Sequence, residues 1–114
     1  MTTWNKISKL SLGFPETEEH NHLGTPAIRV KGKIFVQRSA DDNESILVKL
    51  SKPTQSSLIE EDEEVFSAPS HWGKFGWTNI KFSKVKESNM SNIIEESWIT
   101  VAPKSLSKKR EETT

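Results

Sequence analysis

The chain has 114 residues, of which 32% are hydrophobic and 28% are charged, and its formal net charge is zero. This length accommodates one domain with a modest core. Cysteine is absent, which excludes a disulfide framework, thiolate chemistry and cysteine-ligated zinc. No apolar run is long enough to span a membrane, and the N-terminus lacks the pattern of a signal peptide, so we expect a cytoplasmic protein.

The first predicted element is a short amphipathic helix. Apolar residues recur at every third position from Trp4 to Leu10, behind Thr2 or Thr3 as candidate N-caps. The sequence Gly13-Phe14-Pro15 ends this helix, because glycine readily caps it and proline cannot continue it. We expect Phe14 to fold back onto the helix.

The next part of the chain has the composition of a β-sheet. Three segments show the alternation and the β-branched residues of strands: 27–30, 33–38 and 45–50. Lys31-Gly32-Lys33 is typical of a tight hairpin between the first two. Residues 24–26 and 41–43 are predicted turns, and residues 16–23 fit either a short edge strand or an irregular segment.

A second helix is predicted to begin at Ser51, because Pro53 follows within the first turn, where proline is tolerated. Leu58 and Ile59 are expected to face the core. The five carboxylates of residues 60–64 close the segment and oppose the helix dipole, so we expect this end to fray.

The last part of the chain contains a strand from Thr78 to Phe82 and then the clearest helix. Its apolar stripe follows helical spacing: Met90, Ile93, Ile94, Ser97, Trp98 and Val101. Pro103 ends this helix. Residues 105–114 contain one apolar residue and many charges, so we expect one domain over residues 1–104 followed by a disordered tail.

This order of elements predicts the fold class. One helix precedes three or four strands, and a second helix, one or two further strands and a third helix follow. Strands linked by hairpins favour an antiparallel sheet, and a layer of helices on one face would complete an α+β two-layer sandwich.

Ala68 to Trp77 is the most unusual stretch, with two of the four tryptophans and two of the five glycines. Two interpretations are open: a corner that anchors the core, or a loop that presents aromatic rings and a cation to a partner. His71 fits a hydrogen-bonded residue at a bend better than a general base, because no nucleophile or carboxylate is arranged around it. We therefore expect no catalytic residues and no enzyme.

A candidate binding surface follows from strand alternation. Arg29, Lys31 and Lys81 are predicted to project from the solvent face of the sheet, and Trp77 shares the parity of Lys81. Cations around an exposed ring suit phosphate contacts and base stacking. The alternative is an ordinary solvated face with Trp77 buried under a helix.

Metal binding is considered at His20 and His22, whose rings would point the same way in a strand and could share a metal with Glu18. A third clear ligand is lacking. We expect a solvated edge, no metal and no cofactor.

Three motifs give the chain a resemblance to a known family. They are Glu19-His20-x-His22-x-Gly24-x-Pro26-x-x-Arg29-Val30-x-Gly32-Lys33-Ile34-Phe35, Pro69-x-His71-Trp72-Gly73-Lys74-x-Gly76-Trp77-Thr78-x-Ile80, and Ser97-Trp98-x-x-Val101-Ala102-Pro103-Lys104. In this order they resemble the MmcQ/YjbR family, from about Leu10 to Lys104. The resemblance implies a compact α+β domain with a CyaY-like, double-wing fold.

The resemblance also implies a function: a small non-enzymatic protein with weak, largely sequence-independent DNA binding. The residues expected to contact nucleic acid are Arg29, Lys31, Lys33, Lys74, Trp77 and Lys81. Residues that match the family motif are Gly24, Pro26, Gly32, His71, Trp72, Gly73 and Gly76. The alternative is a protein-interaction adaptor, since related folds include secretion-chaperone-like domains. A third hypothesis is an enzyme or small-ligand protein that uses the His71–Trp72 corner.

Overall fold

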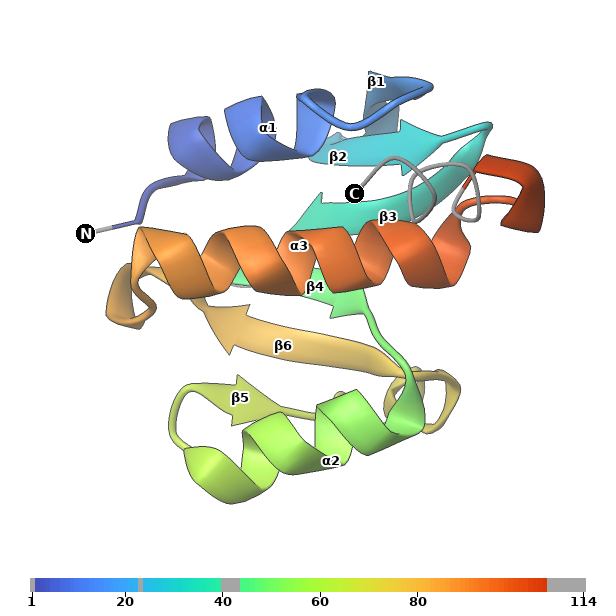
Figure 1. Cartoon of the computed structure of the whole chain (residues 1–114). Helices are drawn as coiled ribbons and strands as arrows, with labels where there is room; N and C mark the ends of the chain where they lie inside the picture. Colours follow the sequence, from blue (N-terminus) through green and yellow to red (C-terminus); the bar gives the residue numbers. More distant parts are fainter. Residues whose placement is uncertain (1, 23, 40–43, 107–114) are drawn as a thin grey trace.

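The computed structural model describes residues 2–22, 24–39 and 44–106. Its elements in chain order are α1 (Trp4–Leu12), β1 (Thr17–His22), β2 (Thr25–Val30), β3 (Lys33–Arg38), β4 (Ser45–Lys49), α2 (Lys52–Glu61), β5 (Phe66–Ser67), the 3₁₀ turn η1 (Gly73–Phe75), β6 (Trp77–Lys81), the 3₁₀ turn η2 (Phe82–Lys84) and α3 (Glu87–Val101). The six strands form one antiparallel sheet in the order β1-β2-β3-β4-β6-β5. In Figure 1, α1 and α3 lie across one face of this sheet and α2 lies beside β5. The predicted α+β class with an antiparallel sheet and packed helices is therefore confirmed.

The hairpin between β2 and β3 forms at the predicted position. Lys31 and Gly32 both have positive φ, 49° and 81°, which matches the right-handed twist of the flanking strands. Lys31 thus lies in the turn and not on the strand face where alternation placed it. The predicted turn at residues 24–26 is also shorter than expected, because Thr25 and Pro26 already belong to β2. The predicted turn at 41–43 lies outside the described residues.

A β-bulge interrupts the pairing of β2 with β3. Ile28 pairs with Val36 and Arg29 pairs with Ile34, so Phe35 has no partner. An unpaired residue shifts the alternation of side chains by one position. As a result, Phe35 and Val36 are both fully buried although they are consecutive.

The helix α3 supplies the centre of the core. Five of the six residues of its predicted stripe are buried, and Val101 is half-buried. The indole of Trp98 is fully buried, and its Nε1 donates to the carbonyl of Pro15 at 3.1 Å. Phe14 stacks on Trp98 with ring centroids 5.8 Å apart, so it packs on α3.

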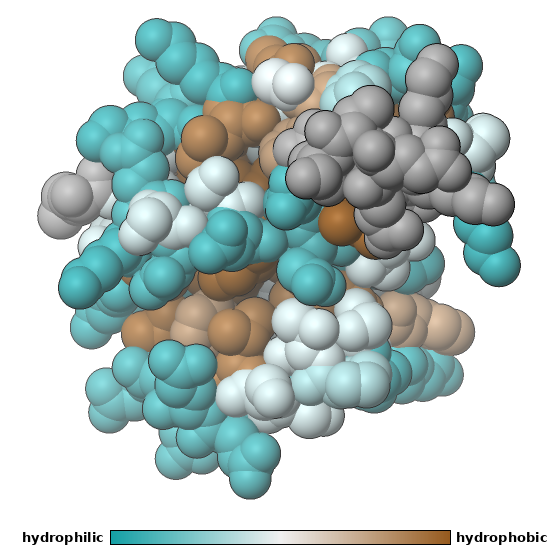
Figure 2. Space-filling model, in the orientation of Figure 1, coloured by the Kyte–Doolittle hydropathy of each residue, from teal (hydrophilic) through white to brown (hydrophobic). Residues whose placement is uncertain are grey.

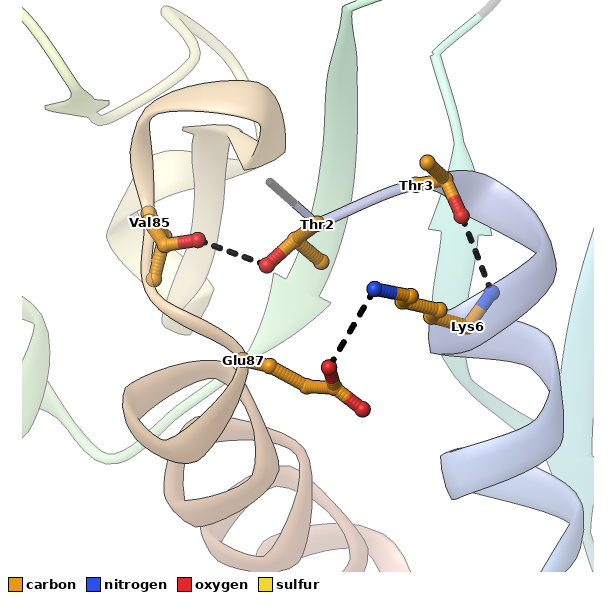
Figure 3. Close-up of polar contacts among 5 residues, drawn as sticks. All are labelled: Thr2, Thr3, Lys6, Val85 and Glu87. Carbon is orange, nitrogen blue, oxygen red and sulfur yellow. Dashed lines mark hydrogen bonds and ion pairs between the residues drawn. The ribbon is translucent and has the colours of Figure 1, made fainter.

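The N-terminal segment is joined to the beginning of α3 (Figure 3). Thr3 caps α1, and its side chain accepts from the amide of Lys6 at 3.3 Å. Thr2 is buried and donates from Oγ1 to the carbonyl of Val85 at 2.6 Å. Lys6 and Glu87 add an exposed ion pair at 3.4 Å. These contacts attach α1 to α3 across most of the chain length.

The first residues after α3 continue the described fold. Residues 104–106 form a helical turn, and Leu106 is half-buried against the core. The rest of the predicted tail, residues 107–114, lies outside the described residues, and the domain boundary stays a prediction. None of the described helices has the length and apolar content that a membrane span requires.

Candidate binding face

The face of the sheet opposite α1 and α3, which we call the open face, carries a row of half-buried side chains. Gln37, Leu47 and Asn79 are direct cross-strand neighbours on β3, β4 and β6. Trp77, which pairs with Lys49, lies two residues before Asn79 on β6 and therefore on the same face of the sheet. Neighbours in such rows lie about 5 Å apart, so the open face presents a continuous strip in which apolar and polar groups alternate.

A hollow of about 310 Å³ opens on this strip. We call it the aromatic pocket, and it is lined by His22, Ile34, Gln37, Leu47, Trp72 and Trp77. Its volume is at the lower end of the range for ligand pockets and suits one side chain or ring. The bulge at Phe35 makes this lining possible, because it allows Ile34 and Gln37, three residues apart, to reach the same face of the sheet.

The outer wall of the pocket is the segment 71–76, which we call the aromatic loop. Trp72 is 55% exposed and Phe75 is 52% exposed, whereas large aromatic side chains are usually covered. The imidazole of His71 meets the Trp72 indole edge-on at 4.8 Å, and the rings of Trp72 and Phe75 are 6.1 Å apart. The Nζ of Lys74 lies 5.2 Å from the Phe75 ring centroid.

A buried glutamine of α2 holds the aromatic loop in place. Gln55 is 2% exposed, and its Nε2 donates to the carbonyls of Gly73 at 3.0 Å and Trp77 at 2.8 Å. Lys52 donates from Nζ to Gln55 Oε1 at 2.7 Å and to the Gly73 carbonyl at 3.1 Å. Buried carbonyls need such donors, so these bonds anchor the loop backbone while its rings stay exposed.

The stretch from Ala68 to Trp77 was interpreted either as a corner that anchors the core or as a loop that presents aromatic rings, and each interpretation holds for some of its residues. Gly73 and Gly76 are buried and serve as the anchoring corner, whereas Trp72 and Phe75 are presented to solvent. Trp77 lies between these cases, half-buried on the open face. It is not covered by a helix as the alternative interpretation required.

The predicted cations do not form one cluster. Arg29 is paired with Glu18 at 2.6 Å, and Lys31, in the hairpin turn, is paired with Glu16 at 3.6 Å. Lys81 lies on β6, three strand positions from β2, which corresponds to roughly 14 Å at the usual strand spacing. Arg29 and Lys81 each lie near the C-terminal end of their strand, and because β2 and β6 run in opposite directions, the two side chains lie toward opposite ends of the sheet.

Three of the five predicted cations lie on separate parts of the surface. Lys33 is exposed at the start of β3, Lys74 is in η1 beside the aromatic pocket, and Lys81 is exposed at the end of β6. Within the described parts of the chain, no carboxylate lies within ion-pair distance of these three lysines. They are available to an external anion but are spread over the surface.

The histidines of β1 lie side by side, as alternation predicted. The ring centroids of His20 and His22 are 6.1 Å apart. Across residues 2–22, 24–39 and 44–106, no group of three or more His, Asp or Glu side chains is placed to hold a metal ion. His22 instead lines the aromatic pocket.

Four residues that line or support this face were not predicted as site residues from the sequence: Ile34, Gln37, Leu47 and Gln55. The position of Leu47 could have been predicted, because it alternates with Ile46 and Val48, which are buried on the other face of β4. Ile34 and Gln37 had none, because the bulge that brings them together cannot be read from local alternation. Gln55 resembled an ordinary polar residue of a surface helix.

Comparisons with known proteins agree with this architecture. The YjbR family model matches residues 12–100. The fold is similar to that of the crystal structure of Deinococcus radiodurans protein DR2400, which has a DUF419 domain, with a TM-score of 0.80 and 14% sequence identity. The similarity covers 96% of this chain and 88% of that chain, and at such identity it establishes the fold alone. No curated protein matches the chain.

Proposed function

The chain belongs to the YjbR family, and on that premise we propose that it is a non-enzymatic binding protein whose aromatic pocket receives an apolar side chain of a protein partner. The observation that carries the proposal is the exposure of Trp72, 55%, at the edge of a hollow lined by Trp77, Leu47 and Ile34. Tryptophan is enriched among the residues that dominate protein–protein binding energy. Exposed apolar surface of this kind marks interaction sites.

The loop's anchoring supports the same function. Gln55 and Lys52 hold the backbone of the aromatic loop before any partner arrives. A pre-organised site loses less conformational entropy on binding than a mobile one. The polar groups of Gln37 and His22 at the pocket wall would orient the partner's backbone, since apolar pockets usually obtain their specificity from a few polar groups.

The test is a selection of a random-peptide library against the full chain, followed by titration of the selected peptides. We expect the selected peptides to share an aromatic or large aliphatic residue and to lose binding by about tenfold or more against Trp72→Ala. Leu12→Ala is the matched control, because Leu12 is also an exposed apolar residue, 38%, but lies on α1. This pocket would be excluded as the binding site if the peptides bound the Trp72→Ala and Leu47→Ser variants with the same affinity as the parent. A selection that enriched no peptide would exclude it too.

DNA binding is a second candidate function, which the family resemblance implies and three exposed lysines favour. Lys33, Lys74 and Lys81 have no carboxylate in ion-pair range among the described residues. The zero net charge and the ion pairs of Arg29 and Lys31 weaken the case, so we expect a dissociation constant no tighter than about 10⁻⁶ M at physiological salt.

Fluorescence anisotropy on a labelled duplex, measured across salt, tests this second candidate. Binding should weaken with a log–log slope of roughly −3 if three phosphates are neutralised. The double variant Lys33→Glu/Lys81→Glu should abolish binding and leave the melting temperature unchanged, since exposed lysines without an ion pair contribute little to stability. If no binding occurs even at low salt, DNA is not the ligand. Binding unchanged in the double variant would place the site on other residues.

A further inference from the structure

A groove of about 420 Å³ runs between α2 and α3, on the side of the sheet opposite the aromatic pocket. It forms because α3 packs mainly on β3 and β4 whereas α2 packs on β5, so the two helices lie apart from each other (Figure 1). The apolar residues that line it are Leu58, Val65, Phe66, Val85 and Ile93. Figure 2 shows the corresponding band of hydrophobic surface between α3 and α2, with hydrophilic surface on either side.

The two walls of this groove carry opposite charges. Glu61 and Asp62, at the end of α2, form an acidic wall. Lys84, the last residue of η2, and Lys86, the N-cap of α3, form a basic wall. Within the described residues, none of these four side chains has an oppositely charged group within 4.0 Å. The carboxylate of Asp62 accepts from the nearby amide of Glu64 at 3.0 Å.

The charges of the acidic wall also destabilise α2 within one copy of the chain. Carboxylates at the C-terminal end of a helix oppose its dipole, and α2 has no basic residue in its last turn. Cations supplied from outside would relieve this repulsion. The basic wall of the same molecule does not supply them, since it lies across the groove without forming an ion pair.

We propose that this groove is the interface of a two-fold symmetric dimer of the chain. In a two-fold symmetric dimer every contact occurs twice. If a residue of the acidic wall in one copy contacts a residue of the basic wall in the second, the same two residues also meet with the copies exchanged. An acidic wall beside a basic wall is therefore self-complementary, because each acidic pair meets the lysine pair of the partner. Of the apolar floor, Leu58 is half-buried in a single copy and the other four residues are already buried, so Leu58 is the floor residue that the dimer would cover further.

This arrangement leaves the open face of each copy accessible. The groove and the aromatic pocket are on opposite sides of the sheet, so a dimer carries two pockets that point away from each other. Two linked sites bind a multivalent target more tightly than one site does. The dimer does not depend on the function proposed for the pocket.

Sedimentation equilibrium of the full chain, up to about 500 µM, tests the proposal. The parent is expected to dimerise, and raising the salt should weaken the dimer because its walls are charged. Glu61→Lys/Asp62→Lys makes both walls basic, and Lys84→Glu/Lys86→Glu makes both acidic. Each variant alone should raise the dimer dissociation constant by about 100-fold or more, because like charges then meet.

The decisive measurement is the mixture of these two variants. An all-basic and an all-acidic groove are complementary, so an equimolar mixture should form a heterodimer although each variant alone is monomeric. Glu96→Lys is the control, since Glu96 is exposed on α3 but does not line the groove, and it should dimerise like the parent. A parent that stays monomeric, or a dimer that survives both variants, would overturn the proposal, and so would a mixture that remains monomeric.

Discussion

At the scale of single residues, the backbone around the aromatic loop leaves little freedom of substitution. Gly76 has φ of +96°, and a Cβ at this position would overlap the carbonyl oxygen of Leu50. The two segments approach this closely because the Leu50 amide donates to the Gly76 carbonyl at 2.9 Å. Gly76 is therefore required by conformation and by space together.

We predict that Gly76→Ala lowers the free energy of unfolding by more than about 3 kcal/mol. The positive φ alone costs roughly 1–2 kcal/mol for an L-residue, and the overlap with Leu50 must also push β4 from the loop. Gly24→Ala is the matched control, since Gly24 has φ of +85° but no atom near the added Cβ, so only the conformational term applies. Chemical denaturation that gives the two variants equal losses would disprove the close approach at Gly76.

At the scale of elements, α3 shows how a periodic stripe becomes a core. Its buried face meets β3 and β4, and Ser97 donates from Oγ to the Phe35 carbonyl at 2.7 Å. That carbonyl belongs to the bulge, so the helix satisfies a backbone group that strand pairing leaves free. Trp98 sits at the centre of this face, between Phe14 and the core.

We predict that Trp98→Ala costs roughly 3–5 kcal/mol of stability, because it leaves a large cavity and frees the Pro15 carbonyl. This is a large part of the total stability of a domain of this size. Glu96→Ala, on the exposed face of the same helix, should change stability by no more than about 0.5 kcal/mol. An unchanged melting temperature for Trp98→Ala would mean that the helix face is assigned incorrectly.

At the scale of the whole molecule, the hydrogen bond between Thr2 and Val85 links residues 83 positions apart in the sequence. Thr2 is 1% exposed and donates to Val85, which brings the N-terminal segment against the start of α3. Contacts of this kind close the helical layer over the sheet. They leave the open face as the accessible side of the sheet.

We predict that Thr2→Val, which keeps the shape and removes the hydroxyl, destabilises the fold by about 1–2 kcal/mol, since the Val85 carbonyl loses its donor. Thr100→Val removes a similar hydroxyl bond, but Thr100 is exposed on α3 and bonds within its own helix, so a loss below about 0.5 kcal/mol is expected. Urea denaturation of both variants compares them directly. Equal losses would indicate that the Thr2 bond does not hold the ends of the fold together.

The sequence by itself determined the helices, the strands and the antiparallel α+β class, because periodicity and turn chemistry are local. The stripe of α3, the Lys31-Gly32 hairpin and the Ser51 cap all follow from neighbours a few residues apart. The antiparallel sheet with packed helices agrees with that prediction and with the fold of DR2400. The predicted ligands, partners and DNA contacts stay predictions.

Only the tertiary structure decided the binding face. The bulge at Phe35 depends on pairing between strands, and it alone places Ile34 and Gln37 on one side of the sheet. Gln55 becomes a loop anchor only when α2 lies against residues 73–77. Both effects depend on contacts between residues that are distant in the sequence. Alternation within a strand indicates which of its side chains are buried, but it does not indicate which strand or helix lies beside it, so no local sequence pattern predicts these contacts.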